Sequence, residues 1–389
     1  MESGMGRRLV SGGAGARKVL ALLGAFAAAG LTLACATADG PYEGTEWTLA
    51  EEPTLRIGAQ DGDPGYLFDR IAAVRMLPNG GLAVADGGSA TVRVYDASGA
   101  HIATMGRRGR GPGEFGRIGH LEVRAPDTIL AYDTSNYRAT RFLLDGTHLD
   151  DVPIRTPAGA PEVYLGTYSN GDAAVAALVP STRGGTDILS DRMAVSRLAR
   201  DGTMVAELGM LKGIRRAGGI AVVPFSPFLH ARLSRDSVFH TDGREPVVRV
   251  LGADGRTARS FPVPIAAPDH GEAWRTLRAE LEARELTTWI EDLPAEVEAE
   301  PVPAIAGMLL GRGGNLWLKH YDPAVDATHL RDGRSRGGAW TVVAPEGDVI
   351  GEVAMPEHFA PLDVSTDRVA GVHVDPLGVE RVVVFEIEG

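Results

Sequence analysis

Residues 70–115 read RIAAVRMLPNGGLAVADGGSATVRVYDASGAHIATMGRRGRGPGEF, and this stretch decides the fold. It holds four short apolar runs: Ala73–Leu77, Leu82–Ala85, Val92–Tyr95 and His101–Met105. The dipeptides between the runs, such as Asn79-Gly80 and Ser98-Gly99, are typical of tight turns that need positive φ. The pattern predicts one antiparallel meander of four strands.

Weaker copies of this meander fill the rest of the chain. A large apolar residue recurs four positions before a turn glycine, at Tyr95, Phe142, Leu198, Leu251, Val343 and Phe385. The copies after the first cover about 118–154, 163–209, 225–263, 304–354 and 362–388. A unit that repeats at this length predicts an array of small sheets that bury their faces on one another.

The last copy has only three strands, and an unassigned strand stands at the other end of the chain. Thr54–Gly58 is followed by a polar turn, Pro-Gly, an aromatic residue and Arg-Ile, as is Ala103–Gly106. It therefore reads as the fourth strand of a copy whose first three strands lie elsewhere. Pairing it with the last copy would close a ring and remove the open sheet edges.

The expected fold class is all-β: a six-bladed β-propeller of four-stranded antiparallel blades, closed by the N-terminal strand. The Asp-Gly turns, the strands that end in Asp, and the link Gly109-x-Gly111-Pro112-Gly113-Glu114-Phe115 resemble NHL-type six-bladed propellers. In particular, residues 54–389 resemble exported bacterial propeller lipoproteins. The resemblance implies a fold and leaves the function open, because unrelated activities use propellers.

The N-terminus predicts export. Arg7, Arg8, Arg17 and Lys18 precede the apolar run Val19–Ala34, which is too short for a comfortable membrane span. Residues 1–34 are expected to be a signal peptide and 35–53 a tether. Cys35, the only cysteine, stands at a lipobox-like site and is the predicted lipidation site. Cleavage at Ala36-Thr37-Ala38, which would release a secreted protein, is the alternative.

Charge and cysteine content limit the possible partners. The net charge of −12 becomes −15 without residues 1–34, so nucleic acid is not an expected partner. A single cysteine allows no internal disulfide, so stability must come from core burial. We expect a monomer that meets the membrane of the cell envelope, in the periplasm or at the outer membrane, only through its lipid.

Residues 268–301 interrupt the strand pattern between the fourth and fifth copies. Trp274, Leu277 and Leu281 have helical spacing, further apolar residues extend the stripe to Leu293, and Asp269 can cap the start. The stretch predicts a helical insert. Such an insert could be a lid on the channel or a cover for exposed sheet edges.

Two polar patterns supply the candidate ligand-binding site at the channel mouth. Aspartates follow the second strands at Asp86, Asp133, Asp242, Asp322 and Asp375, and three of them have a histidine two residues earlier, at His240, His320 and His373. Tyr137 and Arg138 lie close to this set in sequence. The groups could bind a ligand or a divalent metal. Turn-stabilising aspartates and packed histidines would give the same pattern.

No enzyme signature stands out in the sequence. It lacks His-Glu-x-x-His and paired cysteines. The leading hypothesis is an envelope-associated, non-catalytic binding propeller without a cofactor, whose partner is an envelope protein, a peptide or a glycan. The alternative is a metal-dependent hydrolase or lyase, similar to propeller lactonases, with Ca²⁺ or another divalent ion at the channel mouth.

Overall fold

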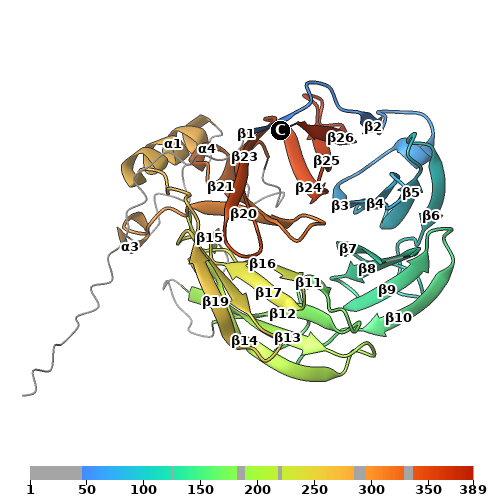
Figure 1. The fold of residues 1–389 in the computed structure, drawn as a ribbon, viewed down its shortest axis with the longest axis horizontal. Helices are drawn as coiled ribbons and strands as arrows, with labels where there is room; N and C mark the ends of the chain where they lie inside the picture. Colours follow the sequence, from blue (N-terminus) through green and yellow to red (C-terminus); the bar gives the residue numbers. More distant parts are fainter. Residues whose placement is uncertain are drawn as a thin grey trace, which may run out of the picture. The chain divides into compact units, whose positions relative to one another are not determined.

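The computed structural model describes residues 46–124, 126–181, 189–217, 221–283, 295–327 and 336–388. Antiparallel sheets are arranged around a central axis as a β-propeller (Figure 1). The first sheet has the order β3-β4-β5-β6 and confirms the predicted meander. Its strands are β3 (Ile71–Met76), β4 (Leu82–Asp86), β5 (Thr91–Tyr95) and β6 (His101–Met105).

Three further sheets follow in chain order, each with neighbouring strands paired in sequence. The second comprises β7 (Ile118–Arg124), β8 (Thr128–Asp133), β9 (Arg138–Leu143) and β10 (His148–Pro153). The third comprises β11 (Val163–Thr167), β12 (Ala173–Val179), β13 (Leu189–Leu198), β14 (Met204–Ala217) and the short β15 (Ala221–Val222). The fourth comprises β16 (His230–Ser234), β17 (Ser237–Thr241), β18 (Val247–Leu251) and β19 (Thr257–Pro262).

The remaining strands form one continuous sheet that joins two meanders. The first meander is β20 (Ile305–Leu310), β21 (Leu316–His320), β22 (Gly338–Val343) and β23 (Val349–Met355). The second is β24 (Phe359–Val364), β25 (Arg368–Val374) and β26 (Glu380–Glu388), completed by β2 (Leu55–Ile57). Strand β1 (Glu46–Leu49) joins the two, parallel to β23 and antiparallel to β26.

Strand β2 pairs with the last strand, β26, in the last sheet, as predicted. Leu55 is paired with Val384, and the Thr54 amide donates a hydrogen bond of 2.8 Å to the Val384 carbonyl oxygen. The innermost strands also contact one another in succession: β3 with β7, then β11, β16, β20, β24 and again β3. The innermost strands therefore form a closed ring around the central axis.

The structure differs from the predicted tether at Glu46–Leu49, which forms β1 instead of a linker. The Trp47 ring lies 5.7 Å from that of Trp317. It also covers Gly351, where an added Cβ would come within 2.7 Å of the indole. Four residues whose partners lie some 300 positions away carry too little local pattern for the strand to be predicted.

The repeat expected from the sequence matches the core. All six apolar residues at the shared offset are buried: Tyr95, Phe142, Leu198, Leu251, Val343 and Phe385. At Gly99 the turn has a φ of 85°, which glycine adopts without strain. Gly389, the last glycine of the series, lies outside the described residues.

Helix α1 (His270–Ala283) and the short helix α3 (Ala295–Glu298) lie within the predicted insert. The Asp269 carboxylate accepts a hydrogen bond of 2.8 Å from the Glu272 amide and so caps α1. Trp274, Leu277 and Leu281 are buried in a cluster with Phe225. Residues 284–294, where the apolar stripe was expected to continue, lie outside the described part.

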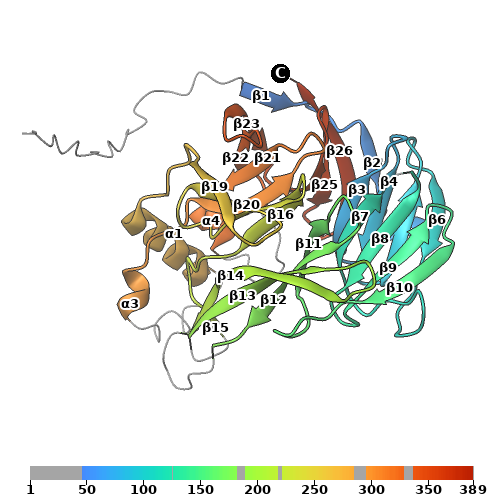
Figure 2. The same ribbon diagram turned by 60° about the horizontal axis from the view of Figure 1, so that its bottom comes forward.

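The described part of the insert sits at the edge of the ring. Figures 1 and 2 both place α1 beside α4 (Pro323–Asp326), away from the central axis. This position fits a cover for sheet edges better than a lid over the channel. No helix among the described residues is long and apolar enough to cross a membrane.

Candidate functional site

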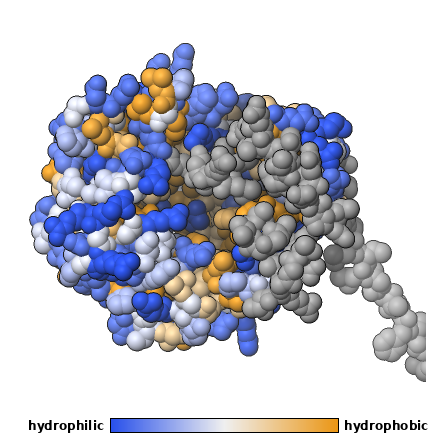
Figure 3. All heavy atoms as spheres, turned by 180° about the vertical axis from the view of Figure 1, so that it is seen from behind, coloured by the Kyte–Doolittle hydropathy of each residue, from blue (hydrophilic) through white to orange (hydrophobic). Residues whose placement is uncertain are grey.

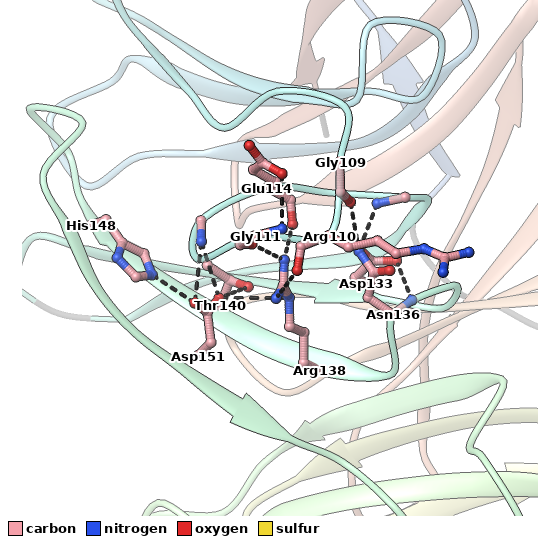
Figure 4. Close-up of polar contacts among 12 residues, drawn as sticks. Gly109, Arg110, Gly111, Glu114, Asp133, Asn136, Arg138, Thr140, His148 and Asp151 are labelled. Atoms are coloured by element: carbon pink, nitrogen blue, oxygen red, sulfur yellow. Dashed lines mark hydrogen bonds and ion pairs between the residues drawn. The ribbon is translucent and has the colours of Figure 1, made fainter.

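The predicted aspartates of the first two sheets form turns with the neighbouring backbone. Asp133 is fully buried, and its carboxylate accepts hydrogen bonds from four amides and from the Asn136 side chain (Figure 4). Two of these amides, Gly116 and Arg117, belong to the link before β7. Asp86 accepts bonds from the Asp69 and Gly88 amides in the same way and lies 3.1 Å from the Arg93 guanidinium. Both carboxylates join an inter-sheet link to a turn.

Arg138 serves the same link. Its guanidinium donates to the carbonyl oxygens of Arg110 at 3.1 Å and Gly111 at 2.6 Å, and to that of Glu114 (Figure 4). Tyr137, with a φ of 53°, lies in the turn between β8 and β9. Arg138 therefore fixes the glycine-rich link before β7 through three backbone carbonyl groups.

The other three predicted aspartates also have local partners. Asp242 forms an ion pair of 2.8 Å with Lys212. Asp322 caps α4 by accepting from the Ala324 amide at 2.9 Å. Asp375 accepts from the Leu377 and Val379 amides and pairs with Arg381 at 2.6 Å. Within the described residues, no three His, Cys, Asp or Glu side chains gather closely enough to hold a metal ion.

The predicted histidines are packed between strands. His320 Nε2 lies 2.7 Å from the Thr341 hydroxyl. His240 and His373 each have one buried ring nitrogen that makes no hydrogen bond among the described residues. Burial, and then the charge of Arg249, lowers the pKa of His240 to about 4. The ring is therefore neutral at pH 7.

A second polar group, which was not predicted from the sequence, lies on the innermost strands. His120, Glu122 and Arg124 alternate along β7; we call them the inner row. The Glu122 carboxylate accepts a hydrogen bond of 3.0 Å from the Arg124 guanidinium and one of 2.8 Å from the Thr167 hydroxyl of β11. The Thr167 hydroxyl lies 2.9 Å from the Tyr164 hydroxyl, and the Tyr164 ring lies 5.0 Å from that of His120.

Cations from two other sheets approach the inner row. Burial is the main cause of the lowered pKa of His120, and the charges of Arg75 on β3 and Arg232 on β16 add to it. These residues come from three different innermost strands of the ring, and the charges of both arginines act on the His120 ring. Figure 3 shows a hollow near the middle of the face seen from behind, with hydrophilic residues on its rim.

Arg232 is the most unusual of these groups. Burial, and then the charge of Arg75, lowers its pKa to about 10. Its Nη1 donates to the carbonyl oxygen of the adjacent Ala231 at 2.7 Å. No acidic side chain in the described parts of the chain forms an ion pair with it. Since burial and Arg232 also lower the pKa of His230 to about 3, that ring stays neutral and adds no charge.

Glu122 supplies the carboxylate of the inner row. Burial alone would raise its pKa, but His120, Thr167 and Arg124 together hold the pKa below its usual value. Glu122 is thus ionised and already satisfied by Arg124 and Thr167. The charge of Arg75 acts on the buried Asp363 of β24, so Arg232 is the cation of this group that has no ion-pair partner among the described residues.

A sequence signal for this site did exist. His120-x-Glu122-x-Arg124 and His230-x-Arg232 place polar residues at period two on first strands, where apolar residues are expected. The aspartates at the ends of the second strands repeat more regularly along the chain and were the predicted site instead.

Comparison with known proteins supports the fold. No protein-family model and no curated protein matches the sequence. Among solved structures, a member of the DUF4221 family from Bacteroides vulgatus is 9% identical, with 88% of this chain and 99% of that chain aligned and a TM-score of 0.53. A protein from Bacteroides fragilis named for its predicted export is 11% identical, with 88% and 95% aligned and a TM-score of 0.47. Virginiamycin B lyase from Staphylococcus aureus is 10% identical, with 88% and 100% aligned and a TM-score of 0.41.

Proposed function

We propose that this chain is an exported, non-catalytic binding propeller that takes an anionic ligand in its central channel. In this proposal it has six blades of the NHL type, residues 1–34 direct export, and Cys35 carries a lipid that anchors the protein to the cell envelope. The closed succession of contacts among β3, β7, β11, β16, β20 and β24 supports the blade number.

The convergence of Arg75, His120 and Arg232 carries the proposal. A buried guanidinium without a carboxylate partner is costly, and an anion from solution would remove that cost. The protein as a whole has a net charge of −12, so a cationic channel within it stands out from its surroundings. A channel with low-dielectric walls also concentrates anions from the solvent. An envelope peptide or glycan that bears carboxylate or phosphate groups fits this chemistry.

The direct test is calorimetric titration of the purified mature protein with inorganic phosphate. Replacing Arg232 with glutamine removes one buried cation and should weaken phosphate binding by about tenfold or more. Arg256→Gln, at an exposed turn between β18 and β19, is the matched control and should bind like the wild type. Equal affinity in wild type and Arg232→Gln would overturn the channel as the binding site.

The proposal includes no resident metal, and the alternative of a metal-dependent hydrolase or lyase makes the opposite prediction. Elemental analysis of the purified protein should find no stoichiometric calcium, and melting curves with calcium or with EDTA should coincide. A stoichiometric metal whose removal lowers the melting temperature would favour the enzyme.

A further inference from the structure

A pocket of about 170 Å³ lies between the second and third sheets, separate from the channel charges of Arg75 and Arg232. Its floor is apolar and includes Leu130 and Ile154. An apolar cavity of about 150 Å³ is large enough for benzene. The volume therefore suits a ligand with one ring or a short chain.

Three arginines line this pocket: Arg124 from β7, Arg141 from β9 and Arg200 from the turn after β13. Arg124 and Arg141 are balanced by Glu122 and Asp150. Arg200 differs from them, because no acidic side chain of the described residues forms an ion pair with it. Arg200 is exposed, and the carboxylate on which its charge acts, Asp172, is already paired with Arg197 at 2.7 Å. The pocket is lined by three guanidinium groups and by no carboxylate of the described residues.

Arg200 is fixed in position by the backbone beneath it. Its Nε donates to the Asn170 carbonyl oxygen at 2.5 Å. It lies across Gly171, where an added Cβ would come within 2.1 Å of Nε. A cation held in one place before binding loses little freedom when a ligand arrives.

Hydroxyl groups complete the polar side of the pocket. Tyr164 and Thr167 both line it, and their oxygens lie 2.9 Å apart. The charges of Arg124 and Arg141 act on the Tyr164 hydroxyl, opposing the rise in its pKa that burial causes. Because the Thr167 hydroxyl donates to Glu122, the Tyr164 hydroxyl donates to Thr167, and the guanidinium groups are the donors left for a ligand. Guanidinium donors beside an apolar floor are groups that recognise a carboxylate on an apolar body.

We propose that this pocket binds a small organic acid, with its ring or chain on the apolar floor and its carboxylate against Arg200. The site is additional to the channel site and does not depend on it. The two sites are neighbours, because Arg124 of the inner row also lines the pocket and the Thr167 hydroxyl donates to Glu122 of the same row.

Benzoate is the probe for this proposal, and benzamide is its neutral counterpart of the same shape. Calorimetric titration of the whole mature protein should detect benzoate at about tenfold or higher affinity than benzamide, because only benzoate gains the charge interaction. Arg200→Gln should weaken benzoate binding by about tenfold and leave benzamide binding unchanged. Arg256→Gln again serves as the matched control.

Two results would overturn the proposal. One is equal binding of benzoate and benzamide, which would mean that the arginines do not recognise charge. The other is loss of benzoate binding in Arg232→Gln but not in Arg200→Gln, which would place the anion in the channel. Melting curves of each variant verify that it is folded, and Ala173→Leu, which reduces the pocket volume, should lower benzoate affinity independently of charge.

Discussion

At the scale of single residues, one residue type at one repeated position does different things. Asp133 is buried and accepts five hydrogen bonds. By contrast, Asp322 caps a short helix, and Asp242 forms an ion pair with a lysine. Asp133 and Asp86 link neighbouring sheets, which explains why the residue recurs without any ligand. A ligand-binding role for the full set stays a prediction.

Replacing Asp133 with alanine should lower the free energy of unfolding by about 3 kcal/mol or more, because it leaves several buried donors without an acceptor. Urea unfolding measures the change. Asp145→Ala is the matched control, since Asp145 accepts from the Thr147 amide in an exposed turn of the same sheet. Similar losses in the two variants would contradict the linking role of Asp133.

The buried His240 predicts a pH dependence of stability. Its pKa is about 4 in the folded protein and about 6.5 in an unfolded chain, so the unfolded chain binds more protons between these values. The contribution of His240 to the free energy of unfolding is therefore fully present above about pH 6.5. It falls as the pH drops toward 4, by up to about 1.4 kcal/mol per pH unit.

His240→Leu should make that dependence shallower. Urea unfolding at several pH values between 7 and 4.5 would measure the slope, and substitution of the exposed His270 controls for the loss of a histidine. An unchanged slope in His240→Leu would mean that His240 takes up no proton on unfolding in this range.

At the scale of elements, the strands of the first sheet were predictable because turn residues bound each apolar run. Strand β6 begins and ends at the residues expected from the sequence, His101 and Met105. Strand β1 was not predictable, because its stability comes from β23 and β26 at the far end of the chain. The capping of α1 by Asp269 was predictable, since a cap acts within one turn of its own helix.

Removal of β2 should destabilise the closed ring. A chain that starts at Ile71 loses the pairing of β2 with β26 and the burial of Ile57, which is 2% exposed. One buried side chain of this size contributes about 1.5–3 kcal/mol, and the lost strand pairing adds to that. Its melting temperature should be clearly lower than that of the mature protein.

A chain that starts at Ala50 separates the two N-terminal strands, because it lacks β1 and keeps β2. It should melt between the mature protein and the chain that starts at Ile71. If the chain that starts at Ile71 melts with the mature protein, β2 does not hold the ring closed.

At the scale of the whole molecule, the ring could be predicted and the channel could not. Repetition and the need to pair every sheet edge lead from sequence to a closed β-propeller. The proposed channel site depends on Arg75, His120 and Arg232, which lie far apart in sequence and act on one another only in the folded ring. No local pattern encodes that meeting, although the alternation along β7 indicates one part of it.

The predicted lipid anchor concerns the whole molecule too, and it lies in the part of the chain outside the described residues. Cys35→Ser should move the protein from the membrane fraction to the soluble fraction of cells, because a serine cannot accept the lipid. Immunoblots of the two fractions measure the shift. If the wild-type protein is already soluble without detergent, an ordinary signal-peptide cleavage is the correct interpretation.

The closure of the ring also sets an order of events in time. The hydrogen bond from the Thr54 hydroxyl to Val384 spans 330 positions of the chain. A ribosome that adds roughly 5–20 residues per second makes β2 about 15–65 seconds before its partner exists. Throughout that interval β2 has no partner strand in its final sheet. Translation must therefore be nearly finished before the ring can lock, and a chain that is exported as we propose would reach the membrane before its ring has closed.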